Sequence, residues 1–471
     1  MSHHSSHLTE LIQQQLKTHG RINLLDQRYS QLFPASSLLQ ESLDHPLRLS
    51  EVGWRHKETP IAYQGLPYLM KQSCFEQIGQ KFTALAHLVE RVIELYLREQ
   101  KIRDFFRLQA CYDRLIRINP GYRPYLQYCR YDFTLDDLGR PRIFALNTHS
   151  PAGFSFYRRV TQVFNHSQIC SDLSAAGLQF KAAPLDADGV FAAAIIKAAQ
   201  EHGFDRPHHY AAILNSRYLS MSNESDRIAA EFSAAGKPAL RCHVEDLSYH
   251  DGCLYYQDKA IDICFNKFDD SDGSNAYEWA FSRSQAEVQA YLNALADGAV
   301  FAVNSFASMY LPENKSMLAL FWSPLLLPYL NTQEIALIQE IIPYSRLLRD
   351  LNSTEYAHVL SNKSELVIKR SLDIGGSGVV IGRDVSHQEW QHVLQQARLM
   401  QDQEEYVIQE LSPVETFSAQ LPAHHTASHY FSSLAYFMIQ GKAQGILVRS
   451  SVEATTNLAR NGFIQPFVLT A

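Results

Sequence analysis

The chain has 471 residues, of which 46% are hydrophobic and 19% are charged, and its formal net charge is −7. This composition excludes a largely disordered chain, and the length predicts two to four lobes at roughly 150 residues per domain. The net charge is negative and the sequence has no cluster of basic residues, which argues against a nucleic-acid partner.

Residues 1–120 are expected to form a mainly helical N-terminal region. Ser73 and Glu76 have the spacing of a capping box, which predicts that a helix begins there. Apolar side chains then recur at helical spacing, and we expect this helix to pack through one face. These side chains are Phe75, Ile78, Phe82, Leu85, Val89, Val92 and Tyr96.

Residues 121–175 contain a hairpin pattern, in which the strand RYDFTL (130–135), the turn DDLGRP (136–141) and the strand RIFALN (142–147) follow one another. Strand side chains alternate, so Arg130 and Asp132 are expected on one face. Asp132 and Asn147 project from paired strands, where two oxygen atoms can share one metal ion. The segment NTHSPAG that follows is expected to be a loop.

Residues 176–300 alternate short β runs with helices. The runs YAAILN (210–215) and AIDICF (260–265) flank the helical segment SDRIAAEFSAAG (225–236). This alternation predicts a small parallel α/β layer. The fold class is therefore α/β, with α+β lobes.

Residues 301–471 are expected to form a compact lobe. A helix begins at Lys315 after Pro312, and LVIKR (366–370) is joined by the loop SLDIGGSG (371–378) to VVIG (379–382). Ser386 and Glu389 cap a helix that leads to the strand YVIQEL (406–411). Strand, loop, strand, helix and strand follow one another in this order.

Nothing in the sequence indicates a membrane anchor. The N-terminus lacks the apolar core of a signal peptide, and Pro324 and Pro328 break the most apolar run, MLALFWSPLLLPYL (317–330). The seven cysteines are scattered without a C-x-x-C pair, which suits a reducing compartment. We therefore expect a cytoplasmic protein.

The loop 371–378 has the composition of a cover that closes over an anion. Because glycine has no side chain, the loop can turn its backbone N–H groups toward an anion. Lys369 adds a positive charge where the first strand meets the loop. No P-loop or dinucleotide glycine motif is present. We interpret the region as an ATP site. The residues expected to contact ATP here are Lys369, Gly375, Gly376, Ser377, Gly378, Gln409, Glu410 and Leu411.

Further groups for a triphosphate lie elsewhere in the chain. Lys315 is expected to reach a phosphate from the side opposite Lys369. Acidic or amide oxygens are needed to hold Mg²⁺ on the phosphates, and Asp132 and Asn147 are the candidates. ATP and Mg²⁺ are thus the expected cofactors.

From residue 121 to residue 471 the chain resembles the circularly permuted ATP-grasp ligases, most closely the synthetase domain of glutathionylspermidine synthase. RYDF and RIFALNTHSP resemble that family's Arg-x-Asp strand and metal-binding strand. NKSMLALFW resembles the first lysine segment, and LVIKRSLDIGGSGVVI resembles the second lysine with its lid. YVIQELSP resembles the adenine hinge, while GILVRSS and TTNLARNGFIQPFV resemble the closing strand and tail.

The resemblance implies an ATP-dependent ligase that joins a small-molecule carboxylate to an amine through an acylphosphate and releases ADP and phosphate. It implies a catalytic role for Arg130, nucleotide contacts for Lys315 and Lys369, and metal binding for Asp132 and Asn147. Glutathione and a polyamine are implied only by analogy. The identity of the substrates and the oligomeric state stay open.

The sequence departs from the family's pattern in the metal-binding strand. Ala145 occupies the position of a glutamate, and His149 stands where an acidic residue is common. A nucleotide-binding pseudoenzyme or regulatory module is therefore a rival prediction, and a phosphotransferase is another.

Individual residues also have purely structural interpretations. GGSG suits a tight hairpin, Asp132 a turn cap and Asn147 a bond to its own backbone. Gln409 and Glu410 are expected to act through backbone groups. Structural roles are also open for Lys315 as a solvated helix residue, and for Arg130, Arg449 and Asn457.

Overall fold

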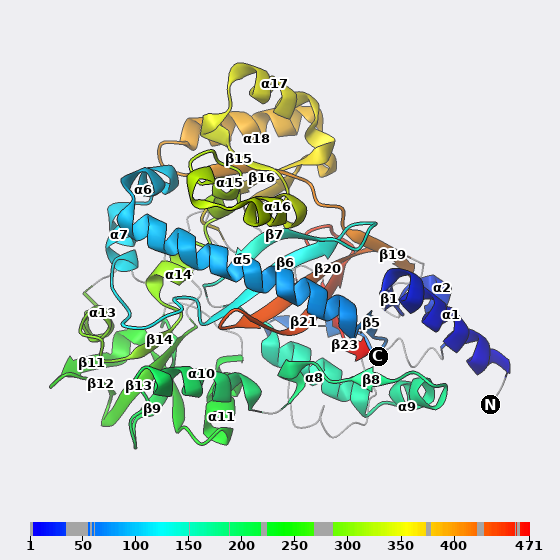
Figure 1. The fold of residues 1–471 in the computed structure, drawn as a ribbon, viewed down its shortest axis with the longest axis horizontal. Coiled ribbons are helices and arrows are strands. Elements are labelled where there is room, and N and C mark those ends of the chain that lie inside the picture. Colours follow the sequence, from blue (N-terminus) through cyan, green and yellow to red (C-terminus); the bar gives the residue numbers. More distant parts are fainter. Residues whose placement is uncertain are drawn as a thin grey trace.

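The structure is a computed structural model, and Figure 1 shows its fold. It covers residues 3–33, 55–56, 59–60, 62–149, 151–187, 189–217, 224–267, 286–373, 378–421, 428–456, 458 and 462–471. The chain is a mixed α/β protein, as the sequence predicts, with helices packed on several separate sheets.

A seven-stranded sheet lies at the centre of the molecule. Its order is β4-β22-β21-β20-β6-β7, and β19 pairs with β20. The predicted hairpin forms its edge, and C-terminal strands pair with it, so that Asp132 lies opposite Ala435. The strands are β4 (Ala62–Tyr63), β6 (Tyr128–Leu135), β7 (Pro141–Asn147), β19 (Glu415–Ala419), β20 (Ser428–Ile439), β21 (Lys442–Ser451) and β22 (Phe463–Gln465).

The long helix α5 (Gln72–Arg98) covers one face of this sheet (Figure 1). Phe82 packs edge-on against Tyr131 and Phe133 of β6 and against Tyr436 of β20. The helix begins at Gln72, so the predicted capping box at Ser73 is wrong. The chain enters the helix directly from β5, and Gln72 instead donates a hydrogen bond to Glu76 at 2.7 Å.

The two chain ends meet in a second sheet of order β1-β5-β23-β8. β5 (Tyr68–Lys71) and β23 (Phe467–Thr470) pair in parallel, flanked by β1 (Arg21–Asn23) and β8 (Phe180–Lys181). Further helices surround these two sheets. They are α1 (His3–His19), α2 (Gln27–Ser30), α6 (Gln100–Phe106), α7 (Ala110–Ile116), α8 (Phe154–Asn165) and α9 (Gln168–Ala175), and β2 (Arg55–His56) pairs with β3 (Thr59–Pro60).

The predicted α/β layer is present, but its sheet is mixed. β10, β9, β13 and β14 pair in parallel, whereas β11 and β12 extend the sheet as an antiparallel hairpin. The hairpin has a turn at Asp251 and Gly252, both at positive φ. The elements are β9 (Tyr210–Asn215), β10 (Ala239–His243), β11 (Leu247–His250), β12 (Cys253–Tyr256), β13 (Lys259–Asn266), β14 (Phe301–Val303), α10 (Val190–Glu201), α11 (Glu224–Ala234) and α13 (Gln289–Ala296).

A four-stranded antiparallel sheet of order β15-β18-β16-β17 forms the upper lobe in Figure 1. The predicted strands and the capping box of Ser386 and Glu389 are confirmed. Trp390 of the helix that follows β17 lies in one buried apolar cluster with Ile368 and Ile408. The elements are β15 (Ser345–Leu347), β16 (Leu366–Arg370), β17 (Val379–Ile381), β18 (Tyr406–Glu410), α15 (Ser316–Phe321), α16 (Thr332–Ile341), α17 (Ser353–Ser361) and α18 (His387–Met400). The short helix α14 (Phe306–Tyr310) lies below α5 in Figure 1, beside α7.

Two predictions about the chain as a whole can be compared with this fold. All seven cysteine thiols are free. Among the described residues, no helix combines the length and the apolar character that crossing a membrane requires. The division of the chain at residues 120, 175 and 300 stays a prediction.

Candidate active site

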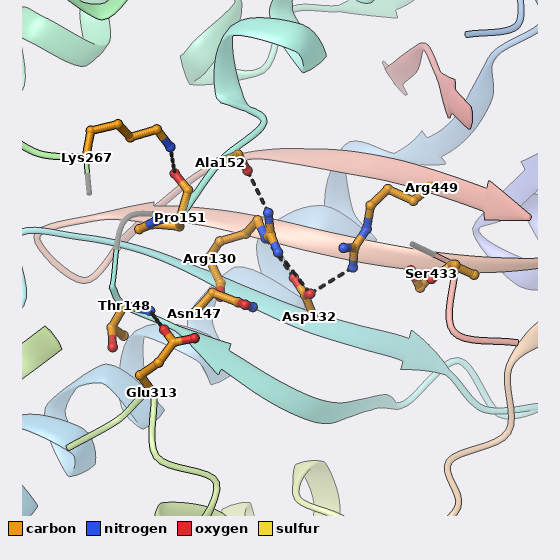
Figure 2. Close-up of polar contacts among 11 residues, drawn as sticks. Arg130, Asp132, Asn147, Thr148, Pro151, Ala152, Lys267, Glu313, Ser433 and Arg449 are labelled. Atoms are coloured by element: carbon orange, nitrogen blue, oxygen red, sulfur yellow. Dashed lines mark hydrogen bonds and ion pairs between the residues drawn. The ribbon is translucent and has the colours of Figure 1, made fainter. Parts of the chain in front are cut away.

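The hairpin of β6 and β7 places its polar side chains on the face opposite α5. Tyr131 faces α5, so the alternating residues Arg130 and Asp132 face the other way. Arg130 lies directly opposite Asn147, and Asp132 lies directly opposite Ala145. The register thus brings together the predicted catalytic and metal-binding residues, as Figure 2 shows.

Asp132 is held by two arginines. It accepts from Arg130 Nε at 2.8 Å and Nη2 at 3.1 Å, and from Arg449 Nη2 at 2.8 Å. Burial by itself would raise the pKa of Asp132, but the charges of Arg130 and Arg449 outweigh it, so the pKa is below its ordinary value. Asp132 is therefore an anion at neutral pH whose charge the arginines neutralise. Arg130 also donates to Ala152 O at 2.6 Å.

The side chain of Asn147 extends from the end of β7. Its Nδ2 donates to Arg130 O at 3.2 Å, which leaves Oδ1 without a partner among the described residues. Ala145, which lies opposite Asp132, has only a methyl group and so offers no atom that could bind a metal ion together with Asp132. Among the residues that the structure describes, no group of three His, Cys, Asp or Glu side chains is arranged to hold a metal ion.

Lys369 of β16 reaches from the upper lobe to the central sheet. Its ammonium donates to Phe144 O of β7 at 2.8 Å and to Gln409 Oε1 at 2.6 Å. Burial, together with the nearby charge of Lys315, lowers the pKa of Lys369 to about 7, although Asp132 acts in the opposite direction. The two predicted lysines thus lie close enough for the charge of Lys315 to lower the pKa of Lys369.

Lys315 sits at the start of α15, as predicted. Its backbone N–H donates to Ser371 O at 2.9 Å, and its ammonium donates to Asp373 O at 2.5 Å. Ser316 and Ser371 join their hydroxyl groups at 2.8 Å beside it. These bonds fix the first lysine to the segment that follows the second lysine. Burial lowers the pKa of Lys315, and the carboxylates of Glu313 and Asp373 oppose the shift.

The predicted hinge strand contributes a side chain as well as its backbone. Gln409 is buried, and its Nε2 donates to Ser345 Oγ at 2.9 Å while its oxygen accepts from Lys369. This differs from the expectation that Gln409 acts only through its backbone. The N–H groups of Glu410 and Leu411 donate to neighbouring carbonyl oxygens at 2.8 Å each.

Part of the predicted cover lies outside the described residues, namely Gly375, Gly376 and Ser377, and so does Asn457. Gly378 is described. A Cβ atom at this position would lie 2.3 Å from Asp373 Oδ2 and 2.7 Å from Arg370 Cβ. Only glycine fits there without a shift of its neighbours.

The sequence reasoning missed Glu313, which lies two residues before Lys315. Its Oε2 accepts from the backbone N–H of Thr148 at 2.6 Å and of His149 at 3.0 Å. Burial raises the pKa of Glu313 to about 7, although the two N–H donors and Lys315 oppose it. The close spacing to Lys315 was the one sequence signal that could have indicated it.

A buried ion pair joins the loop after β7 to the α/β layer. Lys267, just beyond β13, pairs with Glu224 of α11 at 3.0 Å and donates to Pro151 O at 3.4 Å. Glu224 also accepts from Gly153 N at 2.8 Å. The loop that holds Arg130 through Ala152 is therefore fixed from the α/β side, as Figure 2 shows.

The comparison of the sequence with known protein families agrees with this arrangement of the site. The family of circularly permuted ATP-grasp type 2 proteins matches residues 106–450, which is most of the chain. The protein is a circularly permuted ATP-grasp protein. In this ATP-grasp chain the C-terminal strand β20 pairs with β6 on one side and with β21 on the other.

Two solved structures match this chain at low sequence identity. A glutathione synthetase-like effector from Globodera pallida is 13% identical, with a TM-score of 0.55 over 90% of this chain and 94% of its own. A gamma-glutamylcysteine synthetase candidate from Methylobacillus flagellatus is 12% identical, with a TM-score of 0.37 over 80% and 85%. The first likeness supports the fold alone. No curated protein matches the sequence.

Proposed function

We propose that this ATP-grasp protein is an ATP-dependent ligase that joins a carboxylate to an amine. The reaction passes through an acylphosphate and releases ADP and phosphate. A carboxylate resists an amine because oxide is a poor leaving group, and phosphorylation replaces oxide with phosphate. The substrates are small molecules, and the family membership in this chain supports ATP as the phosphoryl donor.

The observation that carries the proposal is the convergence of four cations from distant segments. Lys369 donates to Phe144 O of β7 and lies near enough to Lys315 for that charge to lower its pKa, and Arg130 of β6 and Arg449 of β21 meet at Asp132. Asp132 offsets one of these charges. The net positive charge suits two anions that must approach each other, the γ-phosphate and the substrate carboxylate.

Three of these four cations have assigned tasks in this proposal. Lys369 and Lys315 hold the polyphosphate, because both extend from the lobe that carries the expected cover and hinge. Arg130 stabilises charge on the transferring oxygens, and Asp132 keeps its guanidinium in one orientation through two hydrogen bonds. Closure of the 371–378 segment would exclude water, which otherwise hydrolyses the acylphosphate.

Mg²⁺ would neutralise charge on the triphosphate and orient it for transfer. Asn147 Oδ1 is the kind of oxygen ligand that Mg²⁺ accepts. The carboxylate of Asp132 is already paired with two arginines, and Ala145 contributes no oxygen. The predicted pair of Asp132 and Asn147 is thus a poor site by itself.

The test is the release of ADP by the full chain with ATP, Mg²⁺ and a library of carboxylates and amines. The proposal expects ADP only when a carboxylate and an amine are both present, together with an amide product by mass spectrometry. Lys369→Met should abolish the release, and Lys81→Met on α5, where the half-buried ammonium pairs with Glu340, should not. A stable phosphorylated product without an amide would identify a phosphotransferase instead.

A second candidate function is nucleotide binding without catalysis. It is favoured by one observation, the methyl group of Ala145 opposite Asp132. ATP would then raise the melting temperature of the wild type, since a ligand of the folded state stabilises it, without any ADP release. Under this candidate an Ala145→Glu variant gains ATP hydrolysis that the wild type lacks.

A further inference from the structure

Glu313 is a buried carboxylate with no ion-pair partner among the described side chains. It is 6% exposed, and its Oε2 accepts from two backbone N–H groups, those of Thr148 and His149. Its Oε1 has no partner among the described residues. Lys315 and Arg130 lie near enough to act on its charge, but their donors are directed to Asp373 O, Asp132 and Ala152 O.

Burying such a carboxylate in its charged form costs free energy of folding unless a cation binds to it. A buried charge is normally paired, or it coordinates a metal. Asp132 shows the paired alternative on the same face of the sheet, where two arginines neutralise it. Glu313 has two amide donors on one oxygen, which fix the direction of the other oxygen.

Glu313 also lies near the place of the metal-binding glutamate that Ala145 replaces in β7. Thr148, which donates to Glu313, directly follows Asn147 at the end of β7. Figure 2 shows the Glu313 carboxylate beside Asn147, on the same side of β7 as Asp132. The strand lacks a carboxylate at Ala145, and a carboxylate from a different segment lies at its end.

We infer that Glu313 is a carboxylate ligand of the divalent cation that accompanies ATP, with the amide oxygen of Asn147 beside it. The inference rests on the proposed nucleotide site. It assigns to Glu313 the role that a glutamate at position 145 would otherwise have. The ligand class is a hard divalent cation, for which carboxylate and amide oxygens are the preferred donors.

The experiment is a titration of the full chain with Mn²⁺ in the presence of a non-hydrolysable ATP analogue, followed by electron paramagnetic resonance. Glu313→Gln keeps an oxygen for the N–H groups of Thr148 and His149 but removes the charge. We expect it to weaken Mn²⁺ binding ~10-fold or more. Binding of the analogue in EDTA, measured by calorimetry, should change less than about twofold.

A matched control and a compensating variant sharpen the test. Glu94→Gln, on the exposed part of α5, should bind Mn²⁺ as the wild type does. Ala145→Glu added to Glu313→Gln should restore Mn²⁺ affinity, because it returns a carboxylate to β7. If Glu313→Gln unfolds early, Glu313→Asp is used, since it keeps the charge but withdraws the oxygens, and the same loss is expected.

Three results overturn the inference. Wild-type Mn²⁺ affinity in Glu313→Gln shows that the carboxylate holds no metal, and the proposed function survives. A loss of analogue binding in EDTA as large as the loss of Mn²⁺ binding assigns Glu313 to the nucleotide or to the loop. No binding of the analogue to the wild type, with or without Mn²⁺, removes both this inference and the proposed function.

Discussion

Lys369 donates a hydrogen bond to Gln409 Oε1 at 2.6 Å, across the two central strands of the upper-lobe sheet. The amide of Gln409 cannot rotate freely, because its Nε2 donates to Ser345 Oγ at 2.9 Å. Ser345 in turn donates to Pro343 O at 2.8 Å. This chain of buried bonds orients the ammonium of Lys369.

Gln409→Leu should therefore affect both stability and nucleotide binding. It removes the Gln409 acceptor of the buried ammonium, which keeps only Phe144 O, and the donor to Ser345 Oγ, so the free energy of unfolding should fall by about 1–3 kcal/mol. ATP affinity, measured by calorimetry, should fall ~10-fold because Lys369 is no longer oriented. Gln403→Leu on the exposed surface serves as the control, and equal effects of both changes would contradict the assigned role.

ATP binding should weaken as the pH rises through neutrality. The pKa of Lys369 is about 7, so its ammonium is charged below this pH and loses its proton above it. The attraction for phosphate is fully present at about pH 6, and affinity should then fall by up to ~10-fold per pH unit. Calorimetry in buffers of different ionisation enthalpy should detect proton uptake on binding above pH 7. Lys369→Arg should remove the dependence, and a flat profile in the wild type would refute it.

Asp132→Asn should destabilise the protein strongly. The change removes the negative charge between Arg130 and Arg449, both of which are largely buried. Breaking a buried ion pair by removing one partner costs about 3–5 kcal/mol, and urea unfolding measures it. Adding Arg449→Met should recover part of this loss, because one uncompensated cation disappears. A single-variant loss as small as that of Glu94→Gln would contradict the finding.

Phe82→Ala should loosen α5 from the central sheet. The ring fills the space between Tyr131, Phe133 and Tyr436, and its removal leaves a cavity in the core. We expect thermal and urea unfolding to show a loss of about 3–5 kcal/mol. Leu399→Ala, at a position that is 76% exposed, should change stability by less than about 0.5 kcal/mol.

Local patterns were sufficient to predict several elements of this fold. The β6–β7 hairpin follows from alternation around a turn, in which Asp136 accepts from Leu138 N and Arg140 N. The start of α18 follows from Ser386 and Glu389, whose reciprocal bonds need only four consecutive residues. The predicted capping box at the start of α5 was wrong. The helix follows β5 directly, and no side chain caps its first turn.

The partners within the candidate site could not be predicted in this way. Arg449 of β21 reaches Asp132 of β6 across β20, which pairs with both strands, and no local pattern encodes pairings between segments so far apart in the sequence. The same applies to Glu313 and Thr148. Gln409 was expected to act through its backbone, since its side-chain partner Lys369 is defined only by the register of β16 and β18. The binding roles of the predicted residues stay predictions.

The central claim is that Lys315 and Lys369 hold one polyphosphate, and labelling with an acylphosphate derivative of ATP tests it most directly. Such a reagent transfers its acyl group to lysines that lie beside the bound phosphates, and mass spectrometry identifies the labelled peptides. We predict that Lys315 and Lys369 are both labelled and that excess ATP protects both, whereas labelling of Lys81 is weak and insensitive to ATP. Labelling of neither lysine, or labelling that ATP does not prevent, would contradict the claim.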